Sequence, residues 1–395
     1  MASRPERRPT VEAEPSLVAI LTAWGRIGCL GFGGPPTHIA LLRQLCVTRH
    51  GWLTDDQFED AVAACNLLPG PASTQLAIYC AWRLRGRRGA LVGGLAFVVP
   101  GLVVILALAA VFLANSPPSW VRGAGAGAGA AVAAVAVHAG VGLVPASWRR
   151  AHGTGRWVAY LAAGAVAAAT IGPWLVVVIA GCGVVELASR GVGRRRQAAG
   201  LSAVGPLPLL AAGAAGTGGL LSLAWVALKV GALSYGGGFV IIPLMQADAV
   251  DRYGWMSDGQ FLNAVALGQV TPGPVTQTVA VVGYSAAGLG GGLLAAAMAF
   301  SPSFALVLLG GSRFDQLRAD RRARAFLSGA GPAAIGAIFG SALPLARALT
   351  EPWQHATLAG AAVLLLALRR SVIVTLAAAA ATGLTVAATG GPLPH

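Results

Sequence analysis

The stretch Leu67-Leu68-Pro69-Gly70-Pro71-Ala72-Ser73-Thr74-Gln75 places a Pro-Gly-Pro break inside an apolar segment. A second copy, Thr271-Pro272-Gly273-Pro274-Val275-Thr276-Gln277, lies in the other half of the chain. Each proline lacks a backbone donor and clashes with the preceding helical turn, so neither segment can form one unbroken helix. We therefore expect one broken helix in each half of the protein.

The similarity of the two halves extends well beyond these breaks. When Gly28–Pro71 is laid over Gly231–Pro274 without a gap, about 19 of the 44 positions are identical, including both Gly-Trp pairs. Self-similarity of this kind indicates internal repeats. We predict a polar N-terminal tail over residues 1–15, a first repeat over residues 16–200 and a second repeat over residues 201–395.

Composition places these repeats in a membrane. Hydrophobic residues make up 56% of the chain and charged residues only 11%, with a formal net charge of +14, whereas soluble domains carry roughly a quarter charged residues. No residue ionises at pH 7 between Arg88 and Arg122 or between Asp258 and Arg313, and about 20 apolar residues suffice to cross a bilayer. The arginines occupy short loops, as the positive-inside rule expects, so we predict no nucleic-acid partner.

The apolar segments predict the fold class, which is all-α: a polytopic membrane protein with about 12–13 transmembrane helices in two inverted-topology repeats with Pro-Gly-Pro broken helices. The expected spans lie near residues 16–34, 61–82, 89–114, 121–145, 157–172, 173–188, 219–238, 262–285, 288–311, 325–349, 355–368 and 371–390, with a weak span at 201–217.

Arginine placement predicts that the two repeats have opposite orientations. The loop after the second span is basic in the first repeat, over residues 83–88, and uncharged in the second, over residues 285–292. The loop after the third span reverses this pattern, and Lys- and Arg-rich loops stay cytoplasmic. Inverted repeats are typical of transporters whose site lies near the midplane. Two polar segments, 43–60 and 246–260, are expected at the membrane surface, with Trp52 and Trp255 as interfacial anchors.

The residues after each break predict an anion site. A helix that restarts after Pro71 or Pro274 presents free N–H groups and the positive end of its dipole, which favour a negative ligand. Arg26 and Lys229 occupy the same repeat position deep in an apolar span, where a charge is costly and by default functional. The predicted substrate-binding residues are Arg26, Gly33, Gly34, Pro69, Gly70, Ser73, Thr74, Gln75, Lys229, Gly236, Gly237, Gly273, Thr276 and Gln277.

Several other functions lack residues to support them. The chain has no phosphate-binding GxxxxGK[ST] loop, no GxSxG or HExxH motif, and no metal-ligand spacing among its histidines. We therefore expect no enzymatic activity, no ATP-driven pumping and no metal or other cofactor.

Three motifs recur in both halves of the chain: Phe32-Gly33-Gly34-Pro35, Gly51-Trp52-Leu53 and Leu67–Gln75, with their second-half copies. In these motifs the sequence resembles the chromate ion transporter family in its long, two-domain form. The resemblance implies a multi-pass protein of the bacterial inner membrane with antiparallel halves, which exports chromate and gives chromate resistance. Arg26, Pro69, Gly70 and Thr74 match positions in the family's motifs. Pro36 is a departure from the family's pattern, which has a less rigid residue there. It affects the expectation for the local turn and not the family resemblance.

Three functions remain open from the sequence alone. The first is chromate export, and the second is transport of another tetrahedral oxyanion such as sulfate. The third is a membrane sensor that binds an anion without moving it. The sequence also leaves open the coupling ion and whether the protein forms a homodimer in the lipid bilayer.

Overall fold

The computed structural model describes residues 15–65, 70–114, 116–151, 153–170, 174–190, 219–234, 241–311 and 320–394. These residues form helices joined by short turns, with no strand among them, which confirms the all-α fold class. The weak span at 201–217 lies outside the described residues, as do Pro69, Gly236 and Gly237.

The helices of the first half lie in the predicted apolar segments, with two further short helices, α2 and α3, between α1 and α4. They are α1 (Leu17–Leu30), α2 (Pro35–Arg43) with its π-helical continuation η1 (Gln44–Arg49), α3 (Asp55–Cys65), α4 (Ala72–Phe112), α5 (Ser119–Ala130), α6 (Val132–Arg149), α7 (Thr154–Thr170) and α8 (Leu175–Ser189). Pro36 is compatible with this fold, because α2 begins at Pro35 and prolines are well tolerated in the first helical turn.

With the single helix α15 where the first half has α5 and α6, the second half has a similar order of elements. They are α10 (Leu220–Leu233), α11 (Ile241–Gln246) with η4 (Ala247–Arg252), α12 (Asp258–Val270), η5 (Val275–Gln277), α13 (Thr278–Gly310), α15 (Arg321–Arg347), α16 (Pro352–Ala362) with η7 (Val363–Ala367) and α17 (Val372–Ala388). A π-helix follows the second helix in each half, and the glycine after it, Gly51 or Gly254, has φ of 59°.

The long helices α4 and α13 are hairpins rather than straight rods. In α4 the backbone leaves the helical region at Arg85 (φ −140°) and Gly86 (φ 57°), and in α13 it does so at Ala287 (φ −153°) and Gly288 (φ 62°). A Cβ added to Gly93 would lie 2.5 Å from the Cβ of Ala81, although a straight helix would separate these residues by about 18 Å. Each hairpin therefore has a first arm before the turn and a second arm after it.

The second arms of the two hairpins pack against each other in opposite directions. A Cβ on Gly94 would lie 2.5 Å from the ring of Phe304, and a Cβ on Gly292 would lie 2.5 Å from Leu106. Residue numbers thus rise along α4 as they fall along α13. Since these arms are repeat equivalents, their antiparallel contact is the arrangement expected of inverted repeats. Gly311 also contacts Trp82, which brings the end of α13 beside the turn of α4.

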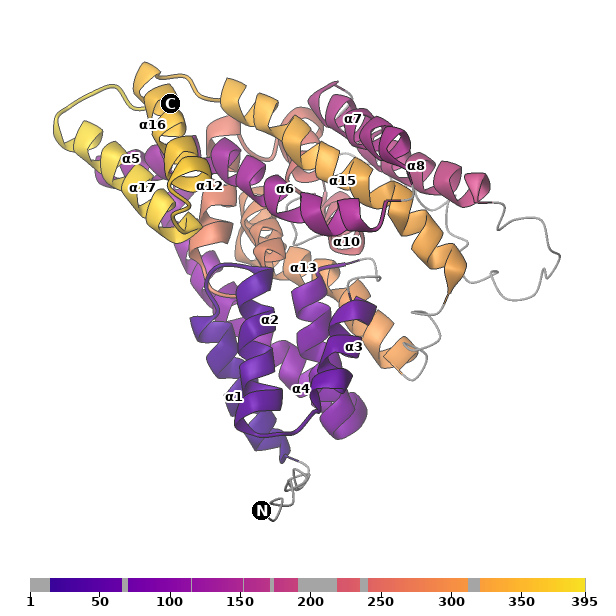
Figure 1. Ribbon diagram of the computed structural model, residues 1–395. Helices are drawn as coiled ribbons and strands as arrows, with labels where there is room; N and C mark the ends of the chain where they lie inside the picture. Colours follow the sequence, from indigo (N-terminus) through magenta and orange to yellow (C-terminus); the bar gives the residue numbers. More distant parts are fainter. Residues whose placement is uncertain are drawn as a thin grey trace, which may run out of the picture.

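The outer helices close the molecule on the side away from α1–α3. Figure 1 shows α15 running beside α6, α7 and α8, while α5, α16 and α17 gather at the other end of the same side. Within the described part of the chain, four helical segments are long and apolar enough to cross a membrane: Ala72–Phe112, Ser119–Arg149, Val275–Gly310 and Arg321–Arg347. Large apolar side chains such as Val103 and Leu309 are exposed along them, as on a lipid-facing surface. The total number of crossings stays a prediction.

Neighbouring helices bury part of the segments 43–60 and 246–260, whose expected place at the membrane surface stays a prediction. The segments α2–η1 and α11–η4 fold back beside α1 and α10, so that Cys46 and residues 246–249 are buried. Trp52 stacks between Trp24 and His50, with ring centroids 6.3 and 4.3 Å apart. In the second repeat the same arrangement buries the polar side chains of Gln246 and Asp248.

Glycines allow α7 and α15 to pack in backbone contact. A Cβ on Gly336 would lie 1.8 Å from the carbonyl oxygen of Leu161. Gly336→Ala is therefore expected to push these helices apart and to destabilise the protein by about 1–3 kcal/mol, which is typical of overpacking. Thermal unfolding in detergent measures this effect. Gly181→Ala on α8, where nothing lies within 4 Å of the added Cβ, is the matched control and should leave the melting temperature unchanged.

Candidate functional site

The break of the second repeat is anchored to the first repeat. The Gly273 N–H donates to the Gly31 carbonyl at 3.1 Å, and Gln277 Nε2 donates to the Val98 carbonyl at 2.8 Å. His38 Nε2 lies 2.8 Å from the same Gly31 oxygen. The end of α1 and the second arm of α4 therefore hold this break in place.

Both breaks are packed closely against a hairpin helix, at Gly101 and at Gly70. A Cβ on Gly101 of α4 would lie 2.1 Å from the Pro272 carbonyl oxygen and 2.6 Å from Gln277 Oε1. Gly70 has φ of +124°, and a Cβ there would lie 2.5 Å from Gln75 Nε2 and 3.3 Å from Ser303 Oγ. Each break thus packs on the second arm of the other repeat's hairpin. We call the place where the two second arms cross, with one break packed on each arm, the crossing.

Buried polar side chains gather at the crossing. We call Thr74, Gln75, Thr276, Gln277 and Ser303 the crossing cluster; each is at most 1% exposed. Thr74 Oγ1, Ser303 Oγ and Gln277 Oε1 have no hydrogen-bond partner among the described residues. A buried polar atom without a partner costs free energy, so such atoms point to a bound ligand or water. Ser73 is also buried, directly before Thr74.

Two helices begin at the crossing. The first arm of α4 starts at Ala72, directly after Pro71, and η5 starts at Val275, directly after Pro274, before leading into α13. The first N–H groups of a helix have no intrahelical partner, and the helix dipole is positive at this end. Together with the hydroxyl groups of the crossing cluster, the two helix starts favour an anion that accepts several hydrogen bonds.

The predicted glycine turn of the first repeat lies beside the second break. Gly33 and Gly34, between α1 and α2, have φ of 101° and 75°, values that favour glycine. A Cβ on Gly34 would lie 3.8 Å from Val275 of η5. The turn therefore contributes backbone next to the crossing, whereas its second-repeat counterparts Gly236 and Gly237 lie outside the described residues.

Lys229 forms a buried ion pair with Asp248, which is not among the predicted site residues. The Lys229 ammonium contacts Asp248 Oδ2, and the side chains are 9% and 1% exposed. The other carboxylate oxygen, Oδ1, has no partner among the described residues. Asp248 was not predicted because it lies in a segment expected at the membrane surface. The one signal in the sequence was the difference between the repeats, since the first repeat has Leu45 at the same position.

Arg26 is exposed, unlike Lys229, and its expected role in substrate binding stays a prediction. On α1 the buried residues are Ile20, Trp24, Ile27 and Gly28, which occupy one helical face, and Arg26 points away from it. Position 26 falls opposite the stripe that packs on α4. Lys229 falls opposite the equivalent stripe of α10, so its burial comes from contacts outside its own helix, such as the one with Asp248. Arg26 and Lys229 therefore share a repeat position but not an environment.

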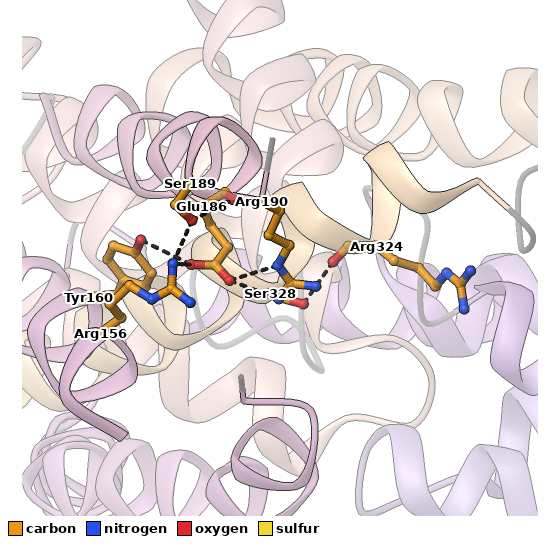
Figure 2. A network of polar contacts seen from close by, with 7 residues as sticks. All are labelled: Arg156, Tyr160, Glu186, Ser189, Arg190, Arg324 and Ser328. Carbon is orange, nitrogen blue, oxygen red and sulfur yellow. Dashed lines mark hydrogen bonds and ion pairs between the residues drawn. The ribbon is translucent and has the colours of Figure 1, made fainter. Parts of the chain in front are cut away.

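A second charged cluster joins α7, α8 and α15 (Figure 2). Glu186 of α8 accepts a hydrogen bond from Tyr160 at 3.1 Å and from Arg190 at 2.8 Å, and Arg156 lies 3.5 Å away. The two cations that match this carboxylate are Arg190, directly after the end of α8, and Arg156, in the first turn of α7. The cluster therefore cross-links the end of α8 to the start of α7.

An open cavity of about 500 Å³ lies at the opposite end of α4 from its turn. Its lining includes Phe112, Arg122, Asn263 and Gln354. Arg122 donates to the Pro394 carbonyl at 3.0 Å. Because the second arm of α4 runs from the Arg85–Gly86 turn to Phe112, this cavity and the basic turn lie at opposite ends of that arm.

Among the described residues, no group of three His, Cys, Asp or Glu side chains could hold a metal ion.

Comparison with known proteins gives one consistent result. The family model described as "Chromate transporter" matches residues 18–187 and 221–384. The chain is 32% identical over 338 residues to a chromate transport protein of Cupriavidus metallidurans, covering 82% of this chain and 80% of the relative. It is 28% identical over 363 residues to a chromate transport protein of Pseudomonas aeruginosa, covering 87% and 85%. A probable chromate transport protein of Synechococcus elongatus is 30% identical, covering 82% of each chain. No solved structure matches.

Proposed function

Because this chain belongs to the chromate transporter family, we propose that it exports chromate from the cytoplasm across the bacterial inner membrane and so confers chromate resistance. The chain is a multi-pass membrane protein with a role in chromate transport. The outward direction and the site at the crossing are the new elements of the proposal.

The observation that carries the proposed site is the set of unpartnered polar atoms at the crossing. Thr74 and Ser303 come from different repeats, yet both hydroxyls are buried without a partner among the described residues. A tetrahedral oxyanion carries four acceptor oxygens, which suit hydroxyl, amide and helix N-terminal donors. Donors from both repeats would let the site open alternately to either face, as in other inverted-repeat transporters.

Lys229 supplies positive charge near this site. It lies on α10 about one and a half turns before Ser234, whose hydroxyl is 3.3 Å from Thr276 Oγ1. An ammonium group is a compact, strongly hydrated charge that attracts an oxyanion without fixing its orientation. In this proposal, Lys229 attracts the dianion and the crossing cluster orients it.

Export of a dianion can run on the membrane potential. Moving each charge through 100 mV is worth about 2.3 kcal/mol, so a dianion that leaves a cell with a negative interior releases roughly twice that amount. Outward transport therefore needs no ATP, whereas uptake of the same ion would need a coupling ion.

Uptake of radiolabelled chromate by everted membrane vesicles tests the proposal. Thr74→Val and Ser303→Ala remove one hydroxyl each and are expected to raise the half-saturating chromate concentration roughly tenfold, the effect of one hydrogen bond to a charged group. Thr375→Val and Ser341→Ala are matched controls, because these hydroxyls are equally buried but bond to their own helices at 3.1 and 2.7 Å.

The same assay separates the alternative functions. Inhibition by excess sulfate would show a site that accepts tetrahedral oxyanions in general, and its absence would show selectivity for chromate. Wild-type vesicles that take up no more chromate than empty ones, from protein that still binds chromate in detergent, would contradict transport and favour an anion sensor. Unchanged uptake in both hydroxyl variants would move the site away from the crossing.

A further inference from the structure

We propose that Asp248 competes with the transported oxyanion for Lys229, so that the carboxylate holds the ammonium between transport cycles and returns to it when the substrate leaves. This inference rests on the proposed function, since it assigns a role to a residue beside the proposed site. It makes Asp248 a residue that sets both affinity and release.

The first support is that one oxygen of the Asp248 carboxylate has no hydrogen-bond partner among the described residues. Lys229 and Asp248 are buried together, but only Oδ2 of the carboxylate contacts the ammonium. Oδ1 is fully buried with no partner among the described residues. A buried ion pair that serves structure alone is normally completed by further hydrogen bonds on the remaining oxygen atoms. The observed pair instead retains an oxygen whose bonding is unsatisfied in this arrangement.

The second support is the difference between the repeats. The equivalents of Lys229 and Asp248 in the first repeat are Arg26, which is exposed, and Leu45, which carries no charge. The first repeat thus forms the same helical pair without an ion pair. Since a buried ion pair contributes little more than an apolar pair to stability, the second repeat does not need these charges in order to fold.

The third support is the charge of the ligand. The Asp248 carboxylate carries one negative charge, whereas chromate at neutral pH carries close to two, so the oxyanion can displace the carboxylate from Lys229. A cation left without a counter-ion would hold the dianion tightly and slow its release. A transport site must bind well enough to load and weakly enough to unload. When the oxyanion leaves, the Asp248 carboxylate pairs with Lys229 again and so replaces the negative charge that the ammonium loses.

The other charged groups near Asp248 allow a matched control. Asp251 and Arg252 lie on the same π-helix, and Asp251 is exposed. On α12, Asp258 accepts a hydrogen bond from Gln246 at 3.1 Å. Asp251→Asn therefore removes the same charge from the same element without touching Lys229.

Concentration-dependent chromate uptake by everted vesicles tests the proposal. Asp248→Asn is expected to lower the half-saturating concentration roughly tenfold, because the competing charge is gone, and to lower the maximal rate several-fold, because release slows. Asp251→Asn should match the wild type in both quantities. A half-saturating concentration that stays unchanged or rises in folded Asp248→Asn would overturn the proposal, since a structural role alone predicts no tighter binding.

A second measurement covers the case in which Asp248→Asn fails to fold. In infrared difference spectra of the purified protein, adding chromate should change a carboxylate stretching band, and Asp248→Glu, which keeps the charge, should shift that band. No chromate-induced carboxylate change in the wild type would overturn the competition. Failure of the proposed function would look different: wild-type vesicles would show no chromate uptake at all.

Discussion

Lys229→Gln is expected to abolish chromate uptake and to destabilise the protein, whereas Arg26→Gln at the same repeat position should do neither. Removing the ammonium leaves the Asp248 carboxylate, 1% exposed, without its partner. Breaking a buried pair in this way costs about 3–5 kcal/mol. The expected result is a much lower melting temperature in detergent together with uptake at the level of empty vesicles.

Arg26→Gln is the control because the two cations differ in environment rather than in sequence position. Arg26 is exposed and forms no ion pair within the described part of the chain, and surface substitutions of this kind change stability by less than about 0.5 kcal/mol. Equal losses in the two variants would show that the first-repeat cation is also essential. That result would restore the symmetric site predicted from the sequence.

The second large effect is expected from Gly101→Ala, which adds one methyl group at the crossing. The new Cβ would lie 2.1 Å from the Pro272 carbonyl oxygen, a backbone atom that cannot rotate away. The second break must then move off α4, which stretches the hydrogen bond from Gln277 to Val98. Displacing a site by about 1 Å can cost as much as a hundredfold in rate, so we expect uptake to fall at least tenfold.

Gly142→Ala on α6 is the control for this substitution, because nothing lies within 4 Å of the added Cβ. The two variants should be compared for membrane insertion as well as for uptake. Normal uptake by inserted Gly101→Ala protein would show that the crossing tolerates displacement. In that case the breaks would have a packing role and the site would lie elsewhere.

Much of the site could be derived from the sequence because it is encoded twice. Pro-Gly-Pro breaks prevent continuous helices wherever they occur, so Gly70, Thr74, Thr276 and Gln277 could be selected by comparing the halves. Ser303 could not, because its first-repeat equivalent is Gly101 and nothing local marks either residue. Their importance follows only from the antiparallel packing of the two hairpins, which places each of them against the other repeat's break.

The sequence by itself determined the all-α membrane fold, the duplication, the breaks and the approximate extent of the spans. These depend on local properties: apolar length, the missing proline donor and the conformational freedom of glycine. Only the tertiary structure decided which equivalent residues have equivalent surroundings. It exposed Arg26, buried Lys229 against Asp248 and packed each break on the other repeat's hairpin. Burial and charge pairing depend on which helices pack side by side and not on the order of residues along each helix.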